Sequence, residues 1–218
     1  MRSSLLRVFV ATLVLTNISA LFAQTQPDGP LPKRHLLELV FVANQSAGAL
    51  TQIGSPIASG NRTIFIVVEP WGQYVYATNT GSNNISGFSI NFDGSLSVVA
   101  GAPFSAGDFT AAIAASRNGN FLIAPTGSGC FVYDVTDSGA LITVPGSPFT
   151  DGGSPNDVAI NSTDGFAYAV NRSSNDVSTY RFNDKKGTLI PVAGSPFPAG
   201  SFAAAIHKRA CAHALAGC

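Results

Sequence analysis

The sequence predicts an all-β protein built from repeated units of four short strands. Three markers recur in register along the chain. A Gly-x-Pro segment begins at Gly54, Gly101, Gly146 and Gly194, at spacings of 47, 45 and 48 residues. A glycine lies seven residues before each of the last three segments and has Leu two residues on, at Gly94, Gly139 and Gly187. An aromatic-rich run precedes that glycine, at 74–79, 121–126 and 166–171. Short strands with a period of about 40–50 residues are typical of β-propeller blades.

Each complete unit divides into four strands that are separated by turn signals. In the first unit we expect strands at 63–68, 73–78, 85–90 and 96–99. Asp93-Gly94 predicts the hairpin between the last two strands, because glycine tolerates a positive φ. The next two units are expected at about 109–144 and 156–192, with the Gly-x-Pro-Phe segments as loops that cross to the following blade. No sustained 3.6-residue apolar period follows the N-terminal segment, so we expect little helix.

The repeats predict an incomplete propeller, since closed propellers have roughly four to eight blades. We expect three complete four-stranded blades and two incomplete flanking ones. The predicted boundaries are an incomplete blade at 36–59, blades at about 60–104, 105–149 and 150–197, and the start of another blade at 198–206. The divergent tail, 207–218, is either a truncated or out-of-frame end or a true terminus that pairs with another chain. An open arc of blades exposes apolar surface, which predicts self-association through the blade edges.

The N-terminus has the pattern of a secretory signal peptide. Residues 1–23 begin with the positive charges of Arg2 and Arg7, continue with an apolar core and end with small residues at Ala20 and Ala23. Cleavage is expected after Ala23, with Ala20 as the alternative, and a plain hydrophobic helix is the competing interpretation. Residues 24–35 then form an extended, proline-containing leader. The mature protein is expected to be secreted or periplasmic.

Composition excludes several classes of function. The chain has 12 Lys and Arg and 12 Asp and Glu, and charged residues make up 11%. Zero net charge argues against nucleic-acid binding. The sequence also has no run of like charge, which argues against binding to a membrane surface. Among the three cysteines, Cys130 lies in an apolar run and is expected to be buried, whereas Cys211 and Cys218 could pair in the tail. No cysteine–histidine spacing matches a zinc site, and we expect no metal and no cofactor.

The repeats resemble two related groups of bacterial propellers. These are the proteins with Tyr-Val-Thr-Asn-type repeats and the seven-bladed lactonase family, which includes 6-phosphogluconolactonase-like proteins. The resemblance rests on Tyr-Val-Tyr-Ala-Thr-Asn at 74–79, Phe-Ala-Tyr-Ala-Val-Asn at 166–171 and the Gly-Ser-Pro-Phe segments at 146–149 and 194–197. It implies hydrolysis of a sugar lactone such as 6-phosphogluconolactone. The motifs are specific for the blade architecture and not for activity, and the chain has about half of the family's blades.

Candidate site residues follow from the loops that line one mouth of a propeller channel. Asp157 and Arg172 are the candidate catalytic pair, since lactone hydrolysis needs a base and a group that stabilises the oxyanion. Further candidates for ligand binding in these loops are Asp108, Asn156 and Asn171, together with Asn79 and Asn83. Glu69 is expected to order a turn. Two alternatives to a lactonase stay open: a secreted or surface module that binds a protein or glycan, and a propeller fragment without independent activity.

Overall fold

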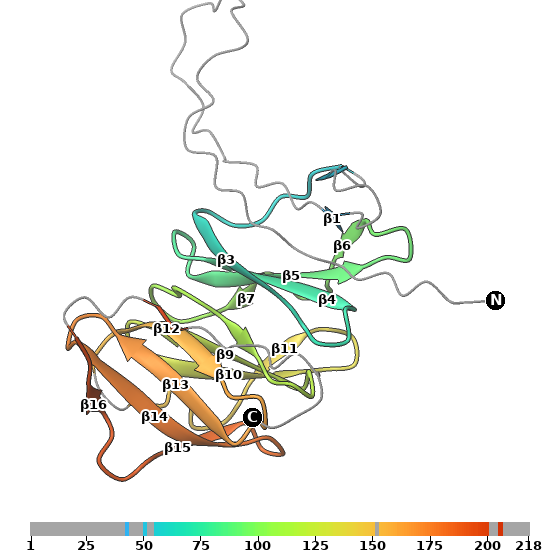
Figure 1. The fold of residues 1–218 in the computed structure, drawn as a ribbon. Coiled ribbons are helices and arrows are strands. Elements are labelled where there is room, and N and C mark those ends of the chain that lie inside the picture. The colour runs from blue at the N-terminus through green and yellow to red at the C-terminus, as the bar shows by residue number, and fades with distance from the viewer. Residues whose placement is uncertain (1–41, 44–49, 52–54, 151–152, 201–204, 207–218) are drawn as a thin grey trace, which may run out of the picture.

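The protein is built from three antiparallel β-sheets that stack one on the next (Figure 1). The computed structural model describes residues 42–43, 50–51, 55–150, 153–200 and 205–206. Over these residues the chain forms strands and turns and no helix, and therefore no helix that could cross a membrane. The expected signal peptide (1–23), leader (24–35) and tail (207–218) lie outside the described residues. The all-β, incomplete propeller architecture is confirmed.

In each sheet four strands pair in sequence order, and we call the three sheets blades 1, 2 and 3. Blade 1 consists of β3 (Thr63–Val68), β4 (Tyr74–Asn79), β5 (Asn84–Ile90) and β6 (Leu96–Val98). Blade 2 consists of β8 (Ala114–Ala115), β9 (Phe121–Thr126), β10 (Gly129–Val135) and β11 (Leu141–Thr143). Blade 3 consists of β12 (Pro155–Ile160), β13 (Phe166–Asn171), β14 (Asp176–Asn183) and β15 (Thr188–Pro191). A separate two-stranded sheet pairs β1 (Val42–Ala43) with β2 (Leu50–Thr51).

The first strand of blade 2 has two residues and begins at Ala114, five residues inside the expected unit at 109–144. Only Ala114 and Ala115 pair with β9, and upstream of them one backbone hydrogen bond reaches β9, from Ala111 N to Pro125 O at 3.2 Å. Pro125 lies within β9 and has no N–H to donate to the first strand. Phe109 also has a positive φ of 46°, which interrupts an extended backbone. The proline therefore shortens the ladder that the repeat pattern predicted.

The Gly-x-Pro-Phe segments are not simple loops, contrary to the sequence-based expectation. Two of them contain short strands, β7 (Phe104–Ser105) and β16 (Phe197–Pro198), which pair with the first residues of β5 and β14. In blade 2 the corresponding residue, Phe149, forms a bridge with Cys130. The third strand of each blade is longer than the fourth, so part of its outer edge is left unpaired, and these segments satisfy its backbone groups.

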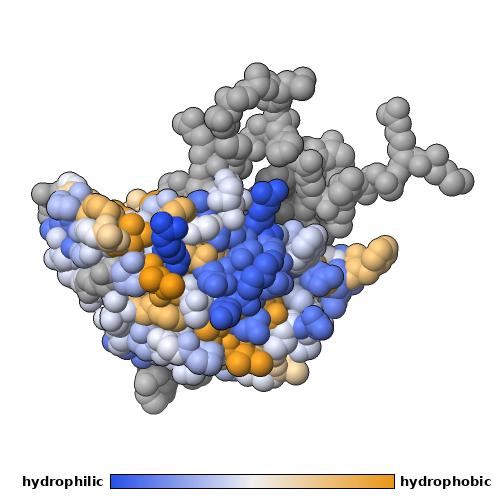
Figure 2. All heavy atoms as spheres, turned by 90° about the horizontal axis from the view of Figure 1, so that it is seen from below, coloured by the Kyte–Doolittle hydropathy of each residue, from blue (hydrophilic) through white to orange (hydrophobic). Residues whose placement is uncertain are grey.

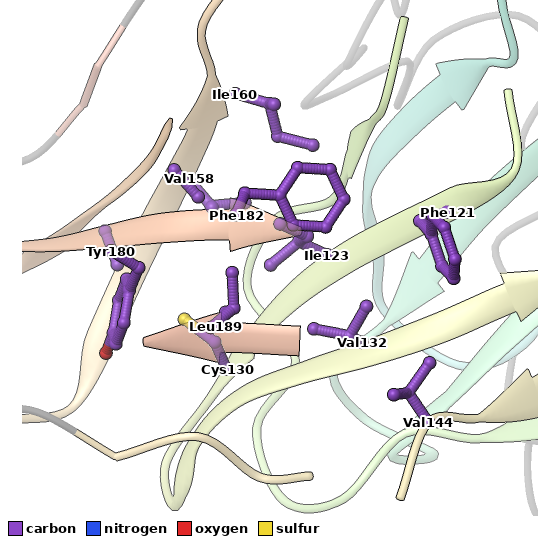
Figure 3. Close-up of a cluster of buried hydrophobic side chains, with 12 residues drawn as sticks. Phe121, Ile123, Cys130, Val132, Val144, Val158, Ile160, Tyr180, Phe182 and Leu189 are labelled. Carbon is purple, nitrogen blue, oxygen red and sulfur yellow. The ribbon is translucent and has the colours of Figure 1, made fainter. Parts of the chain in front are cut away.

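Hydrophobic cores lie between the blades. We call the side of each sheet that points toward the following blade its forward face and the other side its back face. The forward face of blade 2 and the back face of blade 3 form one cluster, which includes Ile123, Cys130, Tyr180 and Phe182 (Figure 3). A second cluster between blades 1 and 2 includes Tyr76, Ile85, Leu122 and Tyr133. In the first cluster, Cys130 is a fully buried free thiol, which confirms the prediction for it.

Candidate functional site

Two ends of the blade stack are distinguished by their loops. The loops that enter each first strand and the loops between second and third strands lie at one end, which we call the mouth end. The hairpins between first and second strands and between third and fourth strands lie at the other end, which we call the turn end. This assignment follows from the antiparallel order of each sheet. All the predicted site residues lie in or beside the mouth-end loops.

Asp157 has both carboxylate oxygens engaged by backbone groups. It is buried in β12, at 7% exposure. Its Oδ1 accepts a hydrogen bond from Val158 N at 2.8 Å, and its Oδ2 accepts one from Ile206 N at 2.8 Å. Ile206 lies in the segment that the repeats predict as the start of the next blade. Asp157 therefore links blade 3 to the chain that follows it, and neither oxygen is free of a donor.

Arg172 does not join Asp157 in this structure. It is an exposed residue directly after β13. In the described part of the chain the two groups form no ion pair, and the single ion pair present joins Lys185 and Asp184 at 3.6 Å. Arg172 is thus a cation at the mouth end that is open to solvent and accessible to a ligand.

Asp108 is the exposed carboxylate at the mouth end with a defined partner. Its Oδ1 accepts a hydrogen bond from Ser128 Oγ at 2.7 Å, and its backbone oxygen accepts one from Gly127 N at 2.9 Å. A Cβ on Gly127 would lie 2.5 Å from Asp108 Oδ2, so a larger residue where the two loops meet would displace the Asp108 carboxylate. Sequence reasoning did not select Ser128, because the loop 126–129 carried no signal beyond its glycines.

The asparagines at the ends of the second strands hold their own blades together. Asn171 is buried, and its Nδ2 donates to Asp176 Oδ1 at 2.6 Å and to Ser178 Oγ at 2.7 Å. Asn79 repeats this arrangement in blade 1, with Asn84 Oδ1 at 2.8 Å and Ser86 Oγ at 2.9 Å. Both amide groups bond to side chains of the third strand of their own blade.

The remaining mouth-end candidates have different surroundings. Asn83 is exposed, and its Oδ1 accepts a hydrogen bond from Phe109 N at 3.0 Å, which connects blade 1 to the loop entering blade 2. Asn156 is half-buried and has an interaction partner of its own. A small pocket of about 50 Å³ lies between blades 2 and 3, lined by Gly127, Ser128, Asn171 and Tyr180 among others. Among the described residues, no group of three or more His, Cys, Asp or Glu could hold a metal ion.

Glu69 lies at the turn end and orders a hairpin, as its position before Pro70 predicted. Its carboxylate accepts hydrogen bonds from the backbone N–H groups of Trp71, at 2.6 Å, and of Gln73 and Tyr74. Ser116 and Asn161 occupy the same position in blades 2 and 3, and each accepts from the backbone of its own hairpin. Three different side chains therefore accept hydrogen bonds from the backbone N–H groups of the equivalent hairpin. This equivalence gives Glu69 a structural role.

A comparison with protein families matches one part of the chain. Residues 99–203 match the family described as "Lactonase, 7-bladed beta-propeller". The resemblance to the lactonase-like propellers is confirmed. No curated protein gives a significant match to the sequence.

Solved structures share the fold of this lactonase-like chain. A protein from Lactobacillus plantarum is 23% identical with a TM-score of 0.64, and the match covers 76% of this chain and 51% of that one. A Bacteroides uniformis protein provisionally named a 6-phosphogluconolactonase is 21% identical with a TM-score of 0.64, covering 74% and 48%. The periplasmic gluconolactonase PpgL of Pseudomonas aeruginosa is 20% identical with a TM-score of 0.60, covering 75% and 48%. The chain spans about half the length of these structures.

Proposed function

We propose that this lactonase-like chain is exported and hydrolyses a sugar lactone at its mouth end. The observation that carries the proposal is the exposed Asp108 carboxylate, which Ser128 holds across two loops of blade 2. A carboxylate that is open to solvent and fixed by one donor keeps a second oxygen for a water molecule. Export is supported by the signal-peptide pattern at 1–23.

The proposed reaction needs a base and a group that stabilises negative charge. Asp108 takes a proton from water as the water oxygen attacks the lactone carbonyl carbon. The carbonyl oxygen becomes an oxyanion in the tetrahedral intermediate, and Arg172 supplies the positive charge that stabilises it. The ring C–O bond then breaks, and protonated Asp108 returns its proton to the leaving alkoxide, which gives the hydroxy acid. Ser128 keeps Asp108 oriented throughout.

Asp157 is less accessible than Asp108 in this proposal, although the sequence favoured it. Both of its oxygens accept backbone hydrogen bonds, and the residue is buried. A water molecule and a lactone therefore have less access to this carboxylate than to that of Asp108. Asp157 is therefore assigned to holding the mouth end in shape.

The test is a pH-stat assay of the purified full chain with glucono-δ-lactone and with 6-phosphogluconolactone, corrected for spontaneous hydrolysis. Asp108→Asn is expected to reduce kcat by about 100-fold or more, the usual contribution of a general base. Arg172→Gln is expected to reduce kcat as well, because it removes the charge that stabilises the oxyanion. Asp137→Asn is the matched control, since Asp137 is an exposed aspartate at the turn end. Equal activity in Asp108→Asn and Asp137→Asn would contradict the proposed site.

A non-catalytic binding module is the second candidate function. It is favoured by the engagement of Asp157 and Asn171 in bonds within the protein, which leaves fewer free polar groups at the mouth end. This alternative predicts saturable binding of the lactone or its hydroxy acid, measured by calorimetry, with no turnover above the spontaneous rate. The pH-stat assay and the calorimetric titration together distinguish a lactonase from a binding module.

A further inference from the structure

Blade 1 differs from the other blades at its turn end, where it carries two exposed aromatic side chains. Trp71, in the hairpin between β3 and β4, is 71% exposed, and Phe92, in the hairpin between β5 and β6, is 107% exposed. Both hairpins lie at the same end of the sheet (Figure 1). The residues at the corresponding positions in blades 2 and 3 are all polar: Asn118 and Thr163 for Trp71, and Asp137 and Lys185, counted from the hairpin glycine, for Phe92. The blade architecture therefore does not require an aromatic ring at either position.

Trp71 is held in place although most of its surface is exposed. Its indole Nε1 donates to Asn118 O in blade 2 at 3.0 Å, and its backbone N donates to Glu69 Oε2 at 2.6 Å. The ring lies over Gly119, where an added Cβ would come within 2.7 Å of Cδ1. One side of the indole thus rests on the glycine of the neighbouring hairpin. The ring is ordered before any ligand binds, which lowers the entropic cost of binding.

The surroundings of Phe92 are polar and suited to hydrogen bonding. In the same hairpin, Asn91 Nδ2 donates to Ser95 Oγ and to Ser97 Oγ, each at 2.9 Å. Asp93 Oδ1 accepts hydrogen bonds from Ser95 N at 3.0 Å and from Ser95 Oγ at 2.6 Å, and these bonds lower the pKa of Asp93. The two hairpins, 69–74 and 91–97, contain no Lys or Arg. The amides and hydroxyls are already oriented, and the only charges are negative.

We propose that Trp71 and Phe92 form a binding surface for a neutral saccharide at the turn end of blade 1. An exposed aromatic ring packs against the apolar C–H face of a sugar ring, while neighbouring amides, hydroxyls and carboxylates bond its hydroxyl groups. An anionic lipid surface would require basic residues beside the aromatic ones, and these two hairpins have none. The surface lies at the opposite end from Asp108, so it does not depend on lactone hydrolysis.

The chain contains a single tryptophan, which gives a direct measurement. The full chain is titrated with cellohexaose, maltohexaose and N-acetylchitohexaose while the fluorescence of Trp71 is followed. At least one of these sugars is expected to give a saturable change in intensity with a shift to shorter wavelength. Phe92→Ser is expected to weaken binding by about fivefold or more, because one aromatic contact is lost. The Phe92→Ser variant is expected to fold normally, since the Phe92 side chain is fully exposed.

Ile142→Ser is the matched control, because Ile142 is an exposed apolar residue on the outer strand of blade 2. It is expected to leave the titration unchanged. No fluorescence change with any of the three sugars would overturn the proposal, and so would a change that Phe92→Ser leaves intact. Vesicles of phosphatidylcholine are titrated in parallel, and binding to vesicles in place of sugars would assign the surface to lipid and reject the saccharide.

Discussion

Among the described residues, a neighbouring blade covers the forward faces of blades 1 and 2, whereas no sheet covers the forward face of blade 3. At corresponding positions, Tyr76 and Ile123 are fully buried and Tyr168 is half-buried. Ile85 and Cys130 are likewise fully buried, and Val177 is half-buried. Figure 2, which views the molecule from the side of blade 3, shows hydrophilic and hydrophobic side chains mixed on this surface.

This comparison shows that the repeat pattern specifies which residues can be buried. Contact with a neighbouring blade then determines which of these residues are buried. Phe121 of blade 2 packs on Gly187 of blade 3, where an added Cβ would lie 2.6 Å from its ring. Phe166 is the corresponding residue of blade 3 and lies beneath the Arg181 guanidinium, 5.6 Å from the ring centroid. In blade 3 the Arg181 guanidinium packs over the Phe166 ring, whereas in blade 2 the Phe121 ring packs on a glycine of the next blade. The guanidinium keeps the open face partly polar.

The largest expected effect compares two phenylalanines of the repeat. Phe104 is 9% exposed between blades 1 and 2, and its counterpart Phe197 is 44% exposed on blade 3. Phe104→Ala is expected to lower the free energy of unfolding by about 3–5 kcal/mol, and Phe197→Ala by about 1 kcal/mol or less. Urea denaturation measures both. Equal losses would mean that the face of blade 3 is covered in solution, and a concentration series would then test whether a second copy covers it.

The next effect concerns the contact that joins blades 2 and 3 at the turn end. Asp164 has a positive φ of 53°, and its carboxylate accepts hydrogen bonds from Arg117 N at 2.9 Å and Asn118 N at 3.3 Å. Asp164→Gly keeps this backbone conformation but leaves the two N–H groups without their acceptor. We expect a loss of about 1–3 kcal/mol in the free energy of unfolding. Asp137→Gly, at an exposed hairpin position, serves as the control and is expected to cost less.

A third prediction uses the alkaline pH dependence of the closed interface. Burial raises the pKa of the Cys130 thiol to about 12, from 9.0. The unfolded chain ionises first, so the stabilisation is complete below pH 9 and is lost as the pH rises from 9 toward 12. Each pH unit in this window costs about 1.4 kcal/mol. Cys130→Val introduces the residue found at the corresponding position 177, and thermal unfolding at pH 8 and pH 10 should show a smaller decrease. An identical decrease in both proteins would contradict a role for this thiol.

The smallest expected effect is at a polar atom inside the interface between blades 1 and 2. Thr78 Oγ1 is buried and has no hydrogen-bond partner among the described residues. Pro125 and Val170 occupy the corresponding positions in the other blades. Thr78→Val has a similar shape and removes an unsatisfied hydroxyl, so we expect no loss of stability and a gain of up to about 1 kcal/mol. A clear destabilisation, seen as a lower urea midpoint, would show that the hydroxyl has a partner in solution.

The repeat pattern predicted the strands of the blades well because each strand is specified by its own residues. The expected strand at 63–68 matches β3 in full, and the expected strand at 85–90 differs from β5 by one residue at its start. Turn glycines and alternating apolar residues act over a few positions, so they can be read from the sequence alone. The short strands β7 and β16 were missed because they form only where a longer third strand leaves an edge to pair with.

The choice among the candidate site residues depended on hydrogen bonds between distant parts of the chain, which a repeat pattern does not specify. The sequence placed Asp157, Arg172, Asp108 and Asn171 in the loops of one end, but it favoured Asp157 over Asp108 as the base. The bond from Ile206 to Asp157 joins residues 49 positions apart, and the bond from Ser128 to Asp108 joins residues 20 positions apart. These contacts engage one carboxylate completely and leave the other open to solvent.

By itself, the sequence determined the all-β architecture, the four-stranded blades and the lactonase-like relationship, because these follow from local turn chemistry and a repeated apolar pattern. The stacking of the blades decided which equivalent residues are buried, which carboxylate is available at the mouth end and which aromatic rings face solvent at the turn end. Burial and hydrogen bonding depend on residues brought together from distant positions, and the chain acquires those neighbours only on folding.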